Sequence, residues 1–171
     1  MAHPLTFVVA VICTTWYTTT MKPQTVEVDA VVEAPPTEVF ALIADPATWP
    51  AWAGFESGEL ERPGRTEPFG VGAIRRMRRG RTTGREEVVR YDEPSHFSYE
   101  LLSGLPVKDY RGDVTLEPVD GGTRITWHST FQPKVPLTGW IWRRGLQRFV
   151  GEIVAALVSQ HAGRSAPHGP A

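Results

Sequence analysis

The sequence predicts an α+β domain in which a curved antiparallel sheet of about seven strands wraps around one long C-terminal helix. Three observations lead to this prediction. Apolar residues recur with helical spacing near the C-terminus, strand-like alternation precedes them, and the links between the alternating segments are short. The chain has 171 residues, of which 41% are hydrophobic. That length suits a single domain with a substantial core and room for an internal cavity.

The predicted long helix covers residues 138–161. Its apolar side chains follow the i, i+3, i+4, i+7 spacing and form one stripe: Leu146, Phe149, Val150, Ile153, Val154 and Leu157. Burial of each such side chain stabilises a fold by about 1.5–3 kcal/mol. Because a lone helix has nothing to bury this stripe against, we expect a broad apolar sheet face opposite it.

The first strand is predicted over residues 25–33, where apolar and polar residues largely alternate. Two short helices are expected next, because Pro36 suits a first helical turn and a turn with two tryptophans follows Asp45-Pro46. Six further strands are predicted at residues 56–62, 70–79, 85–91, 96–102, 107–118 and 123–131. Their short Gly-, Pro- and Asp-containing links indicate sequential antiparallel hairpins.

Two terminal segments fall outside this pattern. Residues 5–13 are apolar, but no Lys or Arg precedes them, no small-x-small cleavage site follows, and a bilayer-spanning helix needs about twenty residues. We therefore predict a leader outside the domain at residues 1–22, one ligand-binding domain at residues 23–162, and a disordered tail at residues 163–171.

Composition excludes several classes of function. The formal net charge of −1 predicts no general attraction to nucleic acid or to an anionic membrane, and we expect no stable membrane insertion. The single cysteine, Cys13, excludes an intrachain disulfide and suits a cytoplasmic location. The five histidines lack metal-ligand spacing, and no Gly-x-Ser-x-Gly motif is present, so we predict no metal and no cofactor.

An arginine-rich hairpin is the one strongly charged feature. It contains Arg75, Arg76, Arg78, Arg79, Arg81 and Arg85. These arginines occupy both faces of the predicted strands, and glutamates on neighbouring strands can neutralise them. We therefore predict a solvated, cross-strand-paired hairpin and not a nucleic-acid site, and we keep an interaction surface as a third hypothesis.

The order of strand, two short helices, six strands and long helix resembles the START-like, or SRPBCC, helix-grip superfamily of polyketide cyclase/dehydrase and lipid-transport proteins. The segments that carry the resemblance are residues 26–52, 85–101, 121–131 and the terminal helix. It implies a helix-grip fold and a cavity for a small hydrophobic molecule. Members include lipid carriers, hormone-binding and ubiquinone-binding proteins, and aromatase/cyclases, so the resemblance leaves the function open.

Alternation along the strands places large aromatic side chains on the concave face, and two tryptophans near one rim. The candidate ligand-binding residues are Trp49, Trp52, Arg75, Glu87, Tyr91, Phe97, Tyr99, Tyr110, Trp127 and Phe131. Arg75 paired with Glu87 is the candidate polar anchor, because buried charges must be paired or bind something polar. The alternatives are a solid aromatic core and an ion pair that is purely structural.

The leading functional hypothesis is a carrier or binding protein for a hydrophobic or aromatic molecule such as a lipid, quinone or polyketide. The alternative is a polyketide aromatase/cyclase or dehydratase that uses the same cavity. In that case the resemblance would give Tyr99 and Tyr110 proton donation, Arg75 charge stabilisation and Trp127 packing against the new ring. No catalytic spacing is matched, so the catalytic residues stay unassigned.

Overall fold

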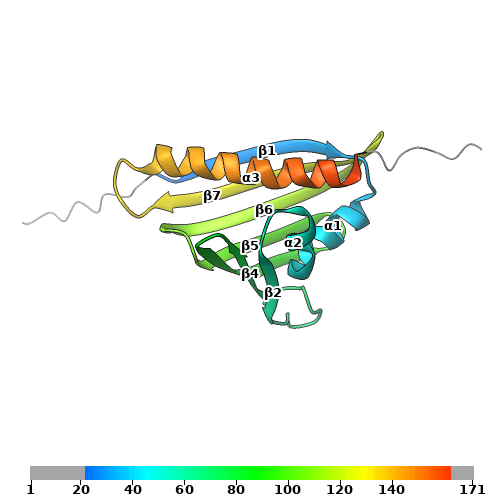
Figure 1. Ribbon diagram of the computed structural model, residues 1–171, viewed down its shortest axis with the longest axis horizontal. Helices are drawn as coiled ribbons and strands as arrows, with labels where there is room; N and C mark the ends of the chain where they lie inside the picture. Colours follow the sequence, from blue (N-terminus) through cyan, green and yellow to red (C-terminus); the bar gives the residue numbers. More distant parts are fainter. Residues whose placement is uncertain (1–21, 163–171) are drawn as a thin grey trace, which may run out of the picture.

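The computed structural model describes residues 22–162 of the chain. The predicted tail, and all of the predicted leader except Lys22, lie outside these residues. Seven antiparallel strands form one curved sheet in the order β1-β7-β6-β5-β4-β3-β2, and the long helix α3 lies against it (Figure 1). The predicted α+β class and its helix-on-sheet arrangement are therefore confirmed.

The described chain forms one strand, three short helical segments and six further strands before it reaches α3. In order, the elements are β1 (Gln24–Val32), α1 (Pro36–Ala44), the 3-10 helix η1 (Pro46–Thr48), α2 (Trp49–Trp52), β2 (Ser57–Arg62), β3 (Ile74–Arg79), β4 (Thr82–Asp92), β5 (His96–Ser103), β6 (Val107–Val119), β7 (Gly122–Pro133) and α3 (Gly139–His161). Because β1 pairs with β7, the first strand is joined to the last, and the sheet ends at β1 and β2.

The apolar stripe of α3 packs as the periodicity predicts. Five of its members are buried, and Phe149 is half-buried. The opposite side of the helix stays in solvent, where Arg148 pairs with Glu152 one turn further on. Gln147 additionally donates a hydrogen bond to the carbonyl of Glu27, at 2.8 Å, which ties the helix to β1.

The strand β3 starts later than predicted. Residues 70–73 form turns, with Gly72 at a φ of +88° that favours glycine, and the ladder with β2 begins only at Ile74. Between residues 62 and 74 the chain therefore forms a loop and not the first half of a strand.

The strand β4 departs from simple alternation at a bulge. Its register with β5 shifts between Val88 and Arg90, so Val89 has no partner on β5. One extra residue reverses the parity of everything before it. Val88 is therefore buried on the inner face where Val89 was expected, and Glu86 takes the inward position predicted for Glu87.

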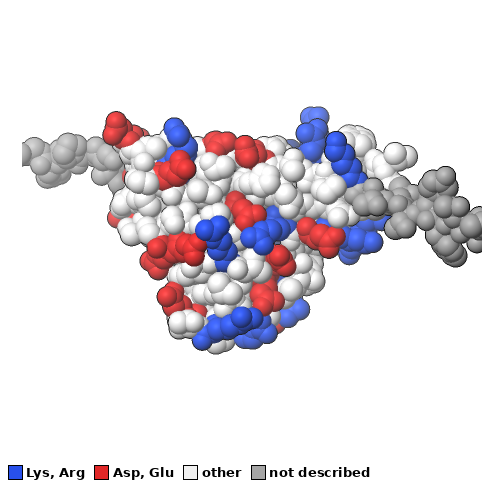
Figure 2. Space-filling view, turned by 180° about the vertical axis from the view of Figure 1, so that it is seen from behind, with Lys and Arg blue, Asp and Glu red and all other residues white. Residues whose placement is uncertain are grey.

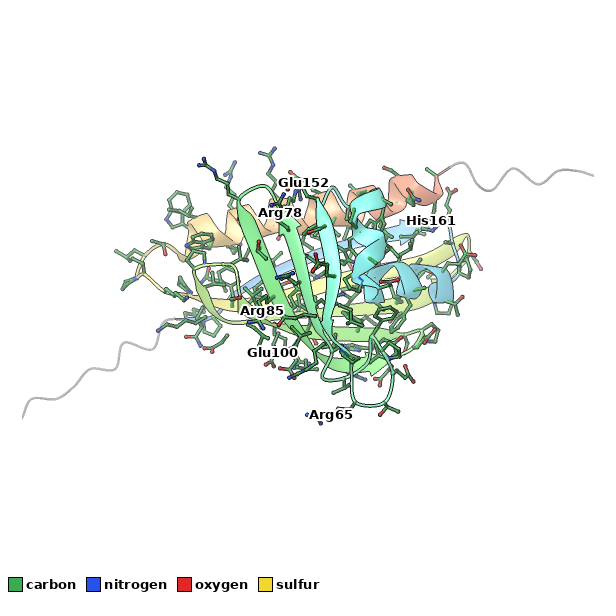
Figure 3. All side chains as sticks on the ribbon, turned by 60° about the horizontal axis from the view of Figure 1, so that its bottom comes forward. Arg65, Arg78, Arg85, Glu100, Glu152 and His161 are labelled. Carbon is green, nitrogen blue, oxygen red and sulfur yellow. The ribbon has the colours of Figure 1, made fainter. Side chains whose placement is uncertain are left out.

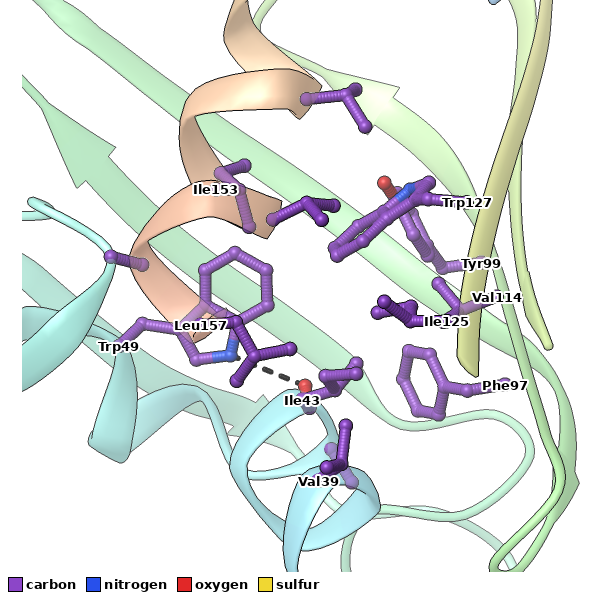
Figure 4. Packing of buried hydrophobic residues seen from close by; sticks show 14 of the residues in the cluster. Val39, Ile43, Trp49, Phe97, Tyr99, Val114, Ile125, Trp127, Ile153 and Leu157 are labelled. Atoms are coloured by element: carbon purple, nitrogen blue, oxygen red, sulfur yellow. Dashed lines mark hydrogen bonds between the residues drawn. The ribbon is translucent and has the colours of Figure 1, made fainter. Parts of the chain in front are cut away.

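One end of the space between sheet and helices is filled with side chains. We call it the closed end, and it is formed by Val39, Phe40, Ile43, Phe97, Val114, Ile125 and Leu157, which are all nearly inaccessible to solvent (Figure 4). Here α1 covers the sheet, and Phe40 meets Phe97 edge to face with ring centroids 6.1 Å apart. Such dense packing leaves no room for a ligand at this end.

Candidate ligand pocket

A pocket of about 340 Å³ lies at the other end, between the sheet and the first half of α3. We call this the open end. Its lining residues are Trp49, Phe55, Met77, Arg79, Thr82, Gly84, Glu86, Tyr99, Leu101, Leu105, Trp127, Trp142, Gly145, Leu146, Phe149 and Ile153. Most of these side chains are apolar or aromatic, and Arg79 and Glu86 carry the charges. A concave, mostly apolar surface with few polar groups is typical of small-molecule sites.

The pocket opens between the β3–β4 hairpin and the first turns of α3. Thr82 on the hairpin and Gly145 on the helix are the exposed members of its lining. The sequence placed Trp49 and Trp52 near one rim of the concave face; Trp49 does line the pocket, but neither tryptophan is exposed at its mouth. Both tryptophans are buried, their ring centroids 5.1 Å apart, and the indole of Trp52 donates to the hydroxyl of Thr48.

A buried ion pair separates the closed end from the open end. Arg75 is fully inaccessible to solvent, and its Nη2 lies 2.7 Å from Oε2 of Glu86. The predicted partner, Glu87, instead faces outward and pairs with Arg62 at 3.2 Å. The predicted Arg75–Glu87 anchor is therefore wrong, because the bulge at Val89 exchanges the faces of the two adjacent glutamates.

The guanidinium of Arg75 is held on several sides. Its Nη1 donates to the carbonyl of Ile43 at 2.7 Å, near the C-terminus of α1, where the helix dipole favours a cation. The same carbonyl accepts a hydrogen bond from the Trp49 indole (Figure 4). The rings of Phe97, Tyr99 and Trp49 surround it, with centroids 4.7, 5.3 and 5.6 Å from Cζ. Arg75 thus connects β3, β4 and α1 within the core. Both of its Nη atoms already donate to protein acceptors, so neither is a free donor for a ligand in the pocket.

Glu86 is a polar group that a ligand in the pocket can contact, and Trp127 Nε1 in the same lining is a buried donor without a hydrogen-bond partner among the described residues. Burial raises the pKa of its carboxyl, and the charge and hydrogen bond of Arg75 oppose that rise only in part. Its Oε2 is occupied by Arg75, whereas Oε1 takes part in none of the hydrogen bonds between described residues. Nη1 of Arg79 also lacks a hydrogen-bond partner, but that atom is buried, whereas Oε1 of Glu86 is not. One carboxyl oxygen therefore faces the open space of the pocket.

Hydroxyl groups form a second buried polar cluster beside the pocket. The Tyr110 hydroxyl lies 3.1 Å from Oγ of Ser129 and 3.5 Å from the Tyr99 hydroxyl. Burial raises the pKa of both tyrosines, so both phenols stay protonated. The ring of Tyr99 lies over Gly112 on β6, where a Cβ would come within 2.4 Å of the ring. This glycine therefore sets the position of the one tyrosine that lines the pocket.

The structure divides the predicted site residues between pocket, core and surface. Trp49, Tyr99 and Trp127 line the pocket. Trp52, Arg75, Phe97, Tyr110 and Phe131 are buried in the core around it. Tyr91 lies in a separate surface groove, where burial, Glu93 and Glu67 raise its pKa to about 12. Glu87 belongs to the outer face.

Several pocket residues were missed by the sequence analysis. Trp142 lies four residues, about one helical turn, before Leu146, so it continues the apolar stripe of α3 with the same spacing. Extending the stripe backward would have found it. No periodic pattern marks Gly84 or Leu105 as pocket residues. They line the pocket because the β3–β4 hairpin and the β5–β6 turn that carry them lie beside it.

The arginines of the arginine-rich hairpin, apart from Arg81, are paired with acidic residues, as predicted. Arg76 contacts Glu59, Arg78 contacts Glu56, and Arg85 contacts Glu61. At the hairpin tip Arg79 reaches Glu152 on α3 at 2.9 Å. Figure 3 labels Glu152 together with Arg78, the neighbour of Arg79 on β3. The Arg79–Glu152 pair clamps the hairpin against the helix at one side of the pocket mouth.

Residues 22–162 offer no sign of a metal centre or of a membrane-spanning helix. They contain no group of three or more His, Cys, Asp or Glu side chains placed to hold a metal ion. None of the described helices is long and apolar enough to cross a membrane.

Comparisons with solved structures show a START-like fold. A START superfamily protein from Mycobacterium smegmatis matches with a TM-score of 0.66 and 14% identity, over 82% of this chain and 96% of the other. The major latex-like protein 151 of Panax ginseng matches with a TM-score of 0.64 and 14% identity, over 81% and 97%. At such low identities the likeness concerns the fold alone. The fold is thus the helix-grip, START-like fold.

Sequence comparison places the chain more narrowly. The sequence model of the family described as polyketide cyclase / dehydrase and lipid transport matches residues 23–162, so the chain belongs to that family. Uncharacterized proteins of Mycobacterium tuberculosis and Mycobacterium bovis are each 30% identical to it over 95 residues, which cover 54% of this chain. The match spans about half, 56%, of the length of these relatives.

Proposed function

We propose that this protein binds and carries a small hydrophobic molecule in the pocket at the open end. One observation supports this most strongly: an apolar pocket of about 340 Å³ that contains a carboxyl oxygen, Oε1 of Glu86, without a protein partner among the described residues. A pocket that served only packing would leave neither the space nor the open acceptor. The single cysteine favours the cytoplasm as the place of action.

The chemistry of Glu86 narrows the ligand class. A hydroxyl group both donates and accepts, so it complements Glu86 whether the carboxyl is ionised or protonated. A ligand carboxylate would place a second negative charge beside Glu86 in an apolar surrounding, which is unfavourable. We therefore propose an apolar alcohol or phenol, with its hydroxyl at Glu86 and its hydrocarbon or ring against Trp127, Leu146 and Phe149.

The test compares two probes of equal chain length, 1-decanol and decanoate, by calorimetric titration at neutral pH. We expect the native protein to bind decanol more tightly than decanoate. The variant Glu86→Gln should bind decanoate better than the native protein does, because the negative charge is gone. The outer-face variant Glu87→Gln is the matched control and should behave like the native protein.

Native mass spectrometry of the purified protein extends the test to the natural ligand. The proposal expects an adduct, and it expects binding to at least one alcohol or phenol from a panel of lipids, quinones and polyketides. No adduct together with no binding across the panel would contradict it.

A second candidate function is catalysis in the same pocket, as a polyketide aromatase/cyclase or dehydratase. The observation in its favour is again Glu86, because a carboxyl whose pKa is raised by burial suits general acid–base chemistry. Arg75 and Tyr110, proposed from the sequence for this role, lie behind the pocket wall. A turnover assay on a linear polyketide would separate the functions: Glu86→Gln should retain the ligand and lose turnover if the protein is an enzyme.

A further inference from the structure

Large apolar side chains are exposed at the start of α3. Of the seven exposed large hydrophobic residues in the described chain, four lie between residues 135 and 141. They are Val135, Leu137, Trp140 and Ile141, with exposed fractions of 58%, 92%, 64% and 51%. Single exposed apolar residues are common, but a cluster of this kind marks an interaction surface. We call these four residues, with the basic residues described next, the α3-start face.

Basic residues flank this cluster. Lys134, Arg143 and Arg144 are exposed, and none of them takes part in an ion pair between described residues. Figure 2 shows Lys and Arg side chains over the end of the molecule where α3 begins. Arg76, Arg78 and Arg85 of the β3–β4 hairpin differ, because Glu59, Glu56 and Glu61 neutralise their charges. The α3-start face therefore combines exposed apolar groups with positive charge that the fold leaves unbalanced.

The backbone holds Leu137 outward at a cost. Its φ of +65° is in the left-handed region, which costs a non-glycine residue about 1–2 kcal/mol. The side chain is nearly fully exposed and gains no burial in return. Strain that keeps an apolar side chain in water indicates a role outside the folded chain itself.

The same face borders the mouth of the pocket. Trp142 and Gly145, which follow Trp140 and Ile141 on α3, line the pocket. Val107 pairs with Pro133, so the β5–β6 turn that carries Leu105 lies beside the loop before α3. A surface that contacts the α3-start face would therefore lie next to the route by which a ligand enters.

We propose that the α3-start face docks reversibly on the surface of an anionic lipid bilayer, with the pocket mouth turned toward the lipid. This inference rests on the proposed carrier function. Trp140 has the amphipathic ring that suits the membrane interface, and the three basic residues complement anionic headgroups. The net charge of −1 predicted no such attraction, but it averages over a chain whose other arginines are largely paired.

A second copy of the chain fits this face less well. A two-fold dimer through it would bring the same patch from both copies together. Lys134, Arg143 and Arg144 would then face their own counterparts, and like charges in contact are unfavourable. An anionic lipid bilayer complements both kinds of side chain, because its headgroups can pair with the basic residues and its acyl chains can contact the apolar ones.

The test is sedimentation of the full chain with phosphatidylcholine vesicles, with and without phosphatidylglycerol. We expect binding to the anionic vesicles that weakens as salt is added. Leu137→Ser with Trp140→Ser, and separately Arg143→Glu with Arg144→Glu, should each lower partitioning by about tenfold or more. The controls, Val31→Ser with Val71→Ser and Arg65→Glu with Arg124→Glu, change exposed apolar and basic residues away from the α3-start face and should bind as the native protein does.

Three results would overturn the docking proposal. The first is equal sedimentation of native protein and both α3-start variants. The second is a dimer in gel filtration that Leu137→Ser with Trp140→Ser dissociates. The third is vesicle binding that appears only when the full chain carries Val8→Asp with Val9→Asp. In that case the chain's own apolar stretch, residues 5–13, and not lipid, would be what the α3-start face binds. Decanol titration of the same variants keeps the two proposals apart. If the variants still bind decanol and sediment with vesicles as the native protein does, the docking proposal is contradicted and the carrier proposal is not.

Discussion

The two ends of the interior are built from the same kind of strand, yet only one of them is filled. At the closed end α1 lies over the sheet, and Phe97, Ile125 and Leu157 pack without gaps. At the open end Trp127, Leu146 and Phe149 face a pocket of about 340 Å³; α1 contributes no residue to its lining, and α2 contributes only Trp49. The aromatic, inward-facing pattern is common to both. The difference shows that the covering elements, more than the strand sequence, decide whether an aromatic face becomes core or cavity.

The Arg75–Glu86 pair lies at the boundary between the ends, and its removal should have the largest effect. Arg75→Ala leaves Glu86 as a buried carboxyl without its partner, which typically costs about 3–5 kcal/mol. Urea unfolding followed by circular dichroism measures this. Arg76→Ala, whose ion pair with Glu59 is exposed, should change the unfolding free energy little.

If Arg75→Ala proves too unstable to purify, a double variant keeps the question open to measurement. Arg75→Met with Glu86→Leu replaces both charges by apolar groups. This double variant should be more stable than Arg75→Ala, in which the buried Glu86 has lost its partner. A single Arg75→Ala variant as stable as the native protein would contradict the boundary role of this pair.

Two leucines on one helix compare the ends directly. Leu157→Ala removes a fully buried side chain from the closed end and should cost about 2–5 kcal/mol, because the tight packing cannot collapse into the void. Leu146→Ala adds its lost volume to an existing pocket, so we expect a clearly smaller loss. Thermal unfolding of both variants provides the measurement, and equal losses would mean that the two ends are packed alike.

The pH dependence of stability tests the environment of Glu86. Its pKa is raised in the folded state from the ordinary value of 4.5, so the folded protein keeps a proton that the unfolded chain has released. Its stabilising contribution is full below pH 4.5 and is lost as pH rises through the folded pKa, by at most about 1.4 kcal/mol per pH unit. The stability of the native protein minus that of Glu86→Gln should therefore fall as pH rises from 4.5, and a rising difference would contradict the assignment.

Much of the fold could be predicted because it depends on periodicity. The stripe from Leu146 to Leu157 and the alternation in β5, β6 and β7 place the correct side chains inward. The bulge at Val89 breaks that rule, since one inserted residue reverses parity and no local residue type announces it. That single position explains why Glu87 was expected where Glu86 lies.

The position of the pocket was beyond sequence reasoning for a different reason. Trp49 and Trp52 were expected at an open rim, but they are buried, because the segment from α1 to α2 covers its end of the sheet. Which end is covered depends on where α1 docks, and that is a tertiary property without a local pattern. Gly84 and Leu105 joined the site through the same long-range arrangement.

The most direct measurement fills the pocket from the sheet side and asks whether binding disappears. Gly84 lines the pocket, and a Cβ built there meets nothing closer than the carbonyl oxygen of Met77, at 3.9 Å. Gly84→Phe should therefore fold, occupy the pocket and abolish decanol binding in calorimetric titration. Thr83→Phe, which places the same ring on the exposed outer face beside Arg76 and Arg78, should bind decanol as the native protein does. Unchanged decanol binding by a folded Gly84→Phe variant would contradict the assignment of ligand binding to the open end.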